Sequence, residues 1–74
     1  MQVQVYLDTF DYKTVEVTKE EDGTFHCQME NVNHAVGVKV KSENFRGLSL
    51  FCLAAMDAIP ELLPGHTALE AKLL

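Results

Sequence analysis

Four short stretches that alternate apolar with polar side chains constrain the fold more than any other feature of this chain. Successive side chains of a β-strand point to opposite faces of its sheet, so each stretch predicts a strand with one buried face. The links between the stretches are short, which predicts an antiparallel meander. The four stretches are residues 2–8, 14–18, 24–29 and 36–41.

The connections between the predicted strands contain turn residues. Asp22-Gly23 lies between the second and third stretches, and Asp-Gly between two alternating runs is a strong hairpin signal. Residues 9–12 are predicted to connect the first two strands, and residues 31–34 to form the turn before the fourth. All four strands would then share one apolar face, which needs a cover.

The residues after position 41 change from a period of two to the helical period. Ser42 is a plausible N-cap, although Gly47 would allow the helix to begin properly at Leu48. Pro60 is expected to end or kink the helix at Ile59. The side predicted to face the sheet consists of Phe45, Leu48, Cys52, Ala55, Met56, Ile59 and Leu63.

The end of the chain carries the signals of a second, short helix. Pro64-Gly65 stops the main helix, and Thr67 with Glu70 matches a capping box, which predicts a helix over residues 68–74. The predicted architecture is a single α+β domain over residues 1–74. It has a four-stranded antiparallel meander covered on one face by one main helix, plus the short C-terminal helix.

Composition restricts the possible partners. Eleven acidic and six basic residues give a formal net charge of −5, which argues against direct binding to nucleic acid. The charge suits a basic protein partner, although modest acidity also serves solubility alone. No apolar run is long enough to span a membrane, and only two cysteines are present, so we expect a cytoplasmic protein.

No catalytic or metal-binding constellation is apparent. Cys27 and Cys52 both fall on predicted core positions, and His26 points to the opposite face from Cys27. His26 and His34 lack the spacing of a dedicated metal site. Lys39 and Lys41 share the polar sheet face with His26 and Tyr6, but the aromatic pairs of a base-stacking surface are not predicted there. We therefore expect no enzyme activity, no cofactor and no metal.

The side of the main helix turned away from the sheet is the predicted binding surface. It is apolar in its first turns and acidic afterwards, which suits a compact contact patch. The predicted contact residues are Leu50, Leu53 and Ala54, rimmed by Asp57 and Glu61, with Glu20, Glu21 and Asp22 as a separate acidic tip. Alternatively, the C-terminal helix folds back and covers this side with Leu69, Leu73 and Leu74.

Part of the chain resembles a known family. The run "VEVTKEEDGTFHCQM", the strand "VGVKV" and the helix "LAAMDAIPELL" together resemble the small HicB-like antitoxin domain over residues 15–63. Two features depart from that family. "MENVNHA" stands where the family has an Asp-x-Pro-Gly segment, and the C-terminal DNA-binding module of longer members has no counterpart in these residues. The resemblance implies a domain that binds and blocks a small basic RNA-cutting toxin.

Three functional hypotheses follow. The first is a non-enzymatic acidic module that blocks a nucleic-acid-acting protein, either as an antitoxin or as a phage inhibitor of a CRISPR effector, which would have the same physical profile. The second is a structural homodimer that pairs through the outer side of the helix. The third is a small enzyme or metal-binding protein that uses His26, His34 and a cysteine.

Overall fold

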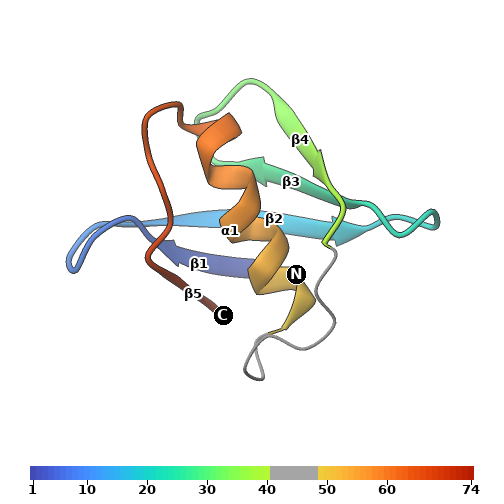
Figure 1. The fold of residues 1–74 in the computed structure, drawn as a ribbon, viewed down its shortest axis with the longest axis horizontal. Coiled ribbons are helices and arrows are strands. Elements are labelled where there is room, and N and C mark those ends of the chain that lie inside the picture. Colours follow the sequence, from blue (N-terminus) through green and yellow to red (C-terminus); the bar gives the residue numbers. More distant parts are fainter. Residues whose placement is uncertain (41–48) are drawn as a thin grey trace.

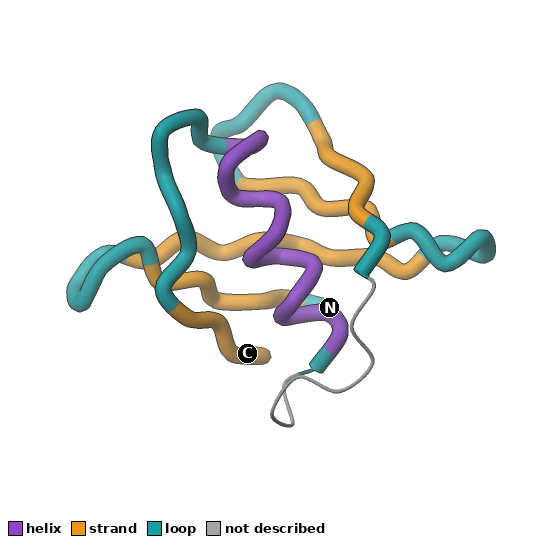
Figure 2. Tube along the Cα trace, viewed as in Figure 1, coloured by secondary structure: helices purple, strands orange, loops and turns teal. Residues whose placement is uncertain are grey.

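The computed structural model describes residues 1–40 and 49–74, which form a sheet with one helix lying across it (Figure 1). Figure 2 shows the helix in purple crossing the orange strands on a single face of the sheet. The elements in chain order are β1 (Gln2–Tyr6), β2 (Tyr12–Lys19), β3 (Phe25–Met29), β4 (Ala35–Val38), α1 (Leu50–Leu62) and β5 (Glu70–Leu73).

The sheet has five antiparallel strands in the order β4-β3-β2-β1-β5. The α+β architecture and the meander of the first four strands are as predicted. The predicted C-terminal helix is wrong, because residues 70–73 pair with β1 as the fifth strand. A helix of seven residues is unstable alone in water, whereas the free edge of β1 satisfies the backbone groups of a strand directly.

The strand registers explain the alternation of the sequence. Val3 of β1 lies opposite Val15 of β2, and Val17 lies opposite Cys27 of β3, so the apolar positions of neighbouring strands share one face. All four of these side chains are fully buried. Gln4, Glu16 and the other alternate positions point to the open face, which α1 does not cover.

The β2–β3 hairpin forms at Asp22-Gly23 as predicted. The amide of Gly23 donates to the carbonyl of Glu20 at 3.1 Å, and Gly23 has a φ of 90°. Asp22 Oδ1 accepts a hydrogen bond from the amide of Thr24 at 2.9 Å. Glycine is favoured at this turn position because positive φ strains a residue that has a Cβ.

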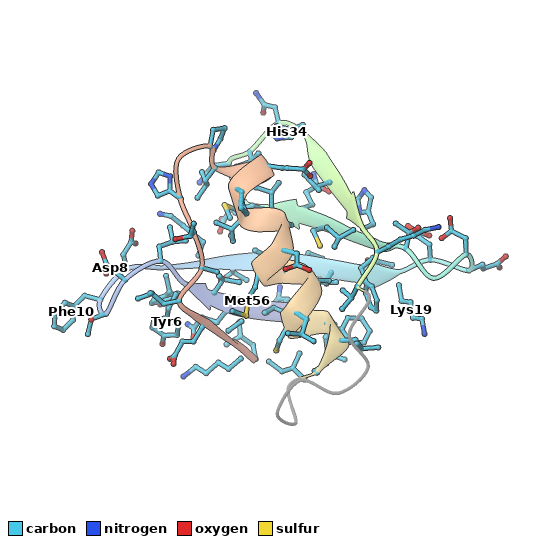
Figure 3. The ribbon with its side chains drawn as sticks, in the orientation of Figure 1. Tyr6, Asp8, Phe10, Lys19, His34 and Met56 are labelled. Atoms are coloured by element: carbon cyan, nitrogen blue, oxygen red, sulfur yellow. The ribbon has the colours of Figure 1, made fainter. Side chains whose placement is uncertain are left out.

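The connection between β1 and β2 spans residues 7–11, whereas residues 9–12 were predicted. Tyr12 already belongs to β2 and lies opposite Tyr6 of β1. Asp8 closes the loop through its Oδ1, which accepts hydrogen bonds from the amides of Phe10 at 2.8 Å and Asp11 at 2.7 Å. Asp favours such turns because its side chain bonds its own backbone two or three residues further on. Phe10 lies at the tip of this loop (Figure 3).

Helix α1 begins after Ser49, whose Oγ accepts a hydrogen bond from the amide of Phe51 at 3.1 Å. Ser42, Phe45 and Leu48, which were assigned to the helix from the sequence, lie outside the described residues. The helix continues through Pro60 to Leu62, so Pro60 does not end it. Its lost N–H removes only one bond near the end of the helix, where few turns remain to be broken.

The core lies between α1 and the sheet. Cys52, Ala55 and Ile59 are buried as predicted, while Met56 and Leu63 lie at the margin. The rings of Phe25 and Phe51 pack edge to face with centroids 5.3 Å apart. Three further helix residues, not predicted to face the sheet, are also buried: Ala54, Ala58 and Leu62. Within residues 1–40 and 49–74, no helix has the length and apolar character that crossing a membrane requires.

Candidate protein-binding surface

The exposed side of α1 carries the predicted contact residues at helical spacing. Leu50, Leu53, Asp57 and Glu61 are three or four positions apart, so they follow one another along one side of the helix. Asp57 and Glu61 are exposed, Leu50 is 37% exposed and Leu53 is half-buried. We call these four residues the helix ridge. The ridge combines two leucines near the helix start with two carboxylates near its end.

Ala54 does not belong to this surface, although it was predicted to be a contact residue. Its exposure is 0%, and it is part of the hydrophobic core. Helix α1 contacts every strand, including both edge strands β4 and β5. The predicted fold-back also fails in its stated form, because Leu69, Leu73 and Leu74 are all exposed.

The charged residues of α1 destabilise the helix. Its residues include two acids and no base, and neither acid lies in the first turn. Asp57 and Glu61 are four positions apart, where like charges destabilise a helix by about 0.2–0.5 kcal/mol. Glu61 also lies near the C-terminus, where the helix macrodipole disfavours an anion by about 0.3–1 kcal/mol. The ridge is therefore a negatively charged surface that a cation would stabilise.

The acidic tip is separate from the helix ridge. Glu20, Glu21 and Asp22 are exposed at the β2–β3 turn, which projects past the sheet beyond Lys19 (Figure 3). The amide of Thr24 donates a hydrogen bond to Asp22, and this bond lowers the pKa of its carboxyl below the usual value. The structure thus groups the helix residues together and leaves the tip as an independent acidic feature.

The two cysteines lie in the core as predicted. Burial raises the pKa of the Cys27 thiol to about 11, and the nearby charge of Asp57 adds to this effect. Burial likewise raises the pKa of Cys52. Both thiols are therefore protonated at neutral pH and are poor nucleophiles, since the thiolate is the reactive form.

The histidines are placed apart in the structure. His26 is exposed on the open sheet face, opposite in direction to the buried Cys27. His34 lies at the turn before β4, where its Nε2 is 3.0 Å from the carbonyl oxygen of Glu61. Among the described residues, no three His, Cys, Asp or Glu side chains gather as metal ligands would.

The open sheet face holds an aromatic pair that was not predicted from the sequence. The rings of Tyr6 and Tyr12 have centroids 5.5 Å apart, and Lys72 Nζ lies 5.6 Å from the Tyr6 centroid. The pair was missed because Tyr12 was assigned to a connection. Its alternation with Thr14 and Glu16 could have identified it as part of the strand.

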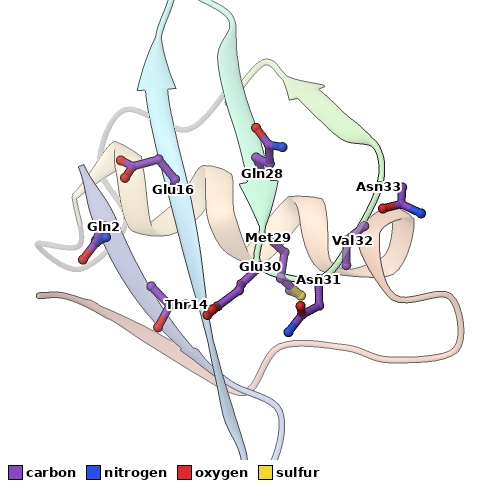
Figure 4. A pocket seen from close by; sticks show the side chains of 9 residues that line it. All are labelled: Gln2, Thr14, Glu16, Gln28, Met29, Glu30, Asn31, Val32 and Asn33. Atoms are coloured by element: carbon purple, nitrogen blue, oxygen red, sulfur yellow. The ribbon is translucent and has the colours of Figure 1, made fainter.

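A polar hollow of about 490 Å³ lies on the same face, beside the β3–β4 turn (Figure 4). Its walls are mostly amide and carboxylate side chains, and those of Glu16 and Glu30 are exposed. Small-molecule sites are mostly apolar and carry only a few polar groups, so the composition of this hollow is the reverse of theirs. The lining residues are Gln2, Thr14, Glu16, Gln28, Met29, Glu30, Asn31, Val32 and Asn33.

Comparison with protein-family models, curated proteins and solved structures gave no match. The resemblance to HicB-like domains therefore stays a prediction, and the proposed function depends on the helix ridge.

Proposed function

We propose that this protein is a non-enzymatic, acidic protein-binding module whose helix ridge binds a basic surface of a nucleic-acid-acting protein and blocks it. The observation that carries the proposal is the placement of Asp57 and Glu61 in the C-terminal half of α1, with no base on the helix. A placement that costs folding stability is typical of a functional surface. Lysine or arginine side chains of a partner would neutralise both the repulsion between the acids and the unfavourable interaction with the helix dipole.

The two leucines of the ridge complete the surface. Protein interfaces combine a desolvated apolar centre with a polar rim, and Leu50 with Leu53 would supply such a centre beside the two acids. Charged rims contribute mainly to partner choice and association rate, whereas buried apolar anchors contribute affinity. The ridge therefore suits a partner that has an apolar pocket bordered by basic residues.

A nucleic-acid-acting protein is the partner class that fits this chemistry. Enzymes and effectors that bind phosphate backbones carry clustered lysine and arginine, and an acidic protein can cover such a cluster. The resemblance to HicB-like antitoxins supports an RNA-cutting toxin as the partner. A CRISPR effector blocked by a phage protein has the same basic surface and is the second possibility within this class.

The test uses capture from nuclease-treated host extract, with the wild-type chain, Asp57→Lys/Glu61→Lys and the control Glu30→Lys as baits. We expect the wild type and the control to capture a basic protein that the double variant fails to capture. Purified and mixed in equal amounts, that protein should lose nucleic-acid binding or cleavage with the wild-type chain. Capture that survives the double charge reversal, or a captured protein whose activity is unaffected, contradicts the proposal.

The stability of the same variants separates binding from folding. Reversing Glu61 places a cation near the helix C-terminus, so Glu61→Lys should raise the free energy of unfolding by several tenths of a kcal/mol to about 1 kcal/mol. Urea denaturation followed by circular dichroism measures this change. A variant that is more stable yet no longer binds would show that the ridge residues serve a partner rather than the fold.

A further inference from the structure

β5 is an edge strand whose outer side pairs with no strand of the described sheet. Natural proteins usually protect such edges, because their unpaired backbone groups are templates for another strand. β5 carries Glu70 and Lys72, but exposed leucines lie in it and beside it. Leu69 is 62% exposed, Leu73 42% and Leu74 63%. This edge is independent of the helix ridge.

The hydrogen bonds to β1 determine which backbone groups of β5 point outward. The amide of Leu74 donates to the carbonyl of Gln2 at 3.0 Å, and Lys72 lies opposite Gln4. Hydrogen-bonded and non-hydrogen-bonded pairs alternate along antiparallel strands. Glu70, Lys72 and Leu74 therefore direct their backbone groups toward β1, whereas Ala71 and Leu73 direct theirs outward.

We propose that two copies of this chain pair antiparallel through β5, with the two-fold axis at Ala71. In this register the amide and carbonyl of Ala71 bond the same groups of the second copy, and the amide of Leu73 donates to the carbonyl of Leu69. The two five-stranded sheets then become one continuous sheet. The interface is isologous, as expected for a two-fold dimer.

Charge selects this register over its neighbours. Glu70 and Lys72 share the open face of β5, and an axis at Ala71 places Glu70 of each copy opposite Lys72 of the other. These are non-hydrogen-bonded positions, where facing side chains are closest. Two neighbouring registers keep the same backbone groups hydrogen-bonded. One places Lys72 opposite Lys72 and the other places Glu70 opposite Glu70, and facing like charges are destabilising.

Leu73 lies on the helix side of the sheet, opposite Val3, and is 42% exposed. Because Leu73 belongs to the paired strand, the pairing would cover part of its exposed side chain. β4, the other edge, consists of Ala35-Val-Gly-Val38 and carries no charge that could select a register.

The test measures molar mass by size-exclusion chromatography with light scattering, from low to several hundred micromolar protein. We expect a dimer for the wild type. Glu70→Lys alone and Lys72→Glu alone each place like charges face to face twice in the symmetric interface, and should raise the dimer dissociation constant about tenfold or more. The double variant Glu70→Lys/Lys72→Glu restores opposite charges and should restore the dimer.

Glu70 and Lys72 are exposed, so all three variants should keep the fold, which circular dichroism checks. Glu61→Lys is the matched control and should leave the dimer unchanged, so failure of this proposal is distinguishable from failure of the proposed function. A wild type that stays monomeric throughout the concentration range overturns the proposal. So does a dimer that both single variants leave intact, or a double variant that fails to recover.

Discussion

Burial decides the chemistry of individual side chains in this protein. Cysteine can act as a nucleophile, but Cys27 in β3 and Cys52 in α1 are both buried. Burial raises the pKa of both thiols, so they are protonated at neutral pH. Asp22, by contrast, is exposed and receives the Thr24 amide, which favours its charged form. The protein thus has unreactive, protonated thiols in its core and an ionised carboxylate at a turn.

The Cys27 thiol predicts a loss of stability at high pH. Its pKa is raised from 9.0 to about 11, so between these values the unfolded chain has released this proton and the folded chain has kept it. The free energy of unfolding should then fall by about 1.4 kcal/mol per pH unit from this group. Well below pH 9 the thiol is protonated in both states and contributes no slope.

Urea denaturation from pH 8 to 11 measures this slope, and Cys27→Ala is the matched variant because other groups also titrate in this range. We expect a shallower slope for the variant. Equal slopes for the two proteins would contradict the assignment.

Native thiols should also react with a disulfide reagent at pH 8 far more slowly than thiols of the unfolded chain.

Gly23 is the second residue for which local structure predicts an effect. Its φ of 90° is unfavourable for a side chain, although an added Cβ would meet no atom within 4 Å. Gly23→Ala should therefore destabilise the fold by about 1–2 kcal/mol through backbone strain alone. Glu21→Ala in the same turn is the control, and thermal unfolding of both proteins would show the difference. Equal melting temperatures would mean that the turn relaxes without cost.

At the scale of elements, the start of α1 and the start of β5 differ in whether a local side-chain pattern determines the element. Ser49 caps α1, while Ser42, the N-cap assigned from the sequence, lies outside the described residues. Thr67 and Glu70 have the spacing of a capping box, yet no helix follows them and Glu70 begins β5. The Ser49 side chain caps the start of α1, whereas pairing with β1 overrides the capping-box pattern of Thr67 and Glu70.

This contrast predicts a pair of outcomes. Ser49→Ala removes the oxygen that accepts the Phe51 amide and should lower the free energy of unfolding by about 1 kcal/mol. Thr67→Ala removes no cap and should change it by less than about 0.5 kcal/mol. Chemical denaturation of both variants checks the pair. A Thr67 effect as large as that of Ser49 would argue for a helix at the C-terminus.

At the scale of the whole molecule, α1 links the sheet into one unit. It contacts all five strands, and Ile59 in its C-terminal half is fully buried. No strand can separate from the sheet without losing contacts with the helix. We therefore expect the described elements to unfold together rather than in parts.

Ile59→Val tests this coupling with a small change. Removing one methylene from a buried isoleucine should cost about 0.5–1.5 kcal/mol. The far-ultraviolet signal of the sheet and helix and the near-ultraviolet signal of the tyrosines should shift by the same amount. Transitions that move apart would show that α1 and the sheet unfold independently.

The sequence by itself determined the elements that have strong local patterns. The alternation around Val3, Val15 and Cys27 predicted three strands and their buried faces, because the side-chain period of a strand is fixed by its backbone. Asp22-Gly23 predicted the hairpin, because positive φ favours glycine. The exposed positions of Leu50, Asp57 and Glu61 followed from the helical period alone.

Only the tertiary structure decided the features that depend on distant segments. Residues 70–73 became a strand because the edge of β1 offered hydrogen bonds that no local pattern reveals. Ala54, which the helical wheel had placed outside, is fully buried in the core. Strand β5 also brings Lys72 against Tyr6 and forms the edge at Ala71. Local periodicity states which way a side chain points, whereas burial depends on how far the assembled sheet extends around it.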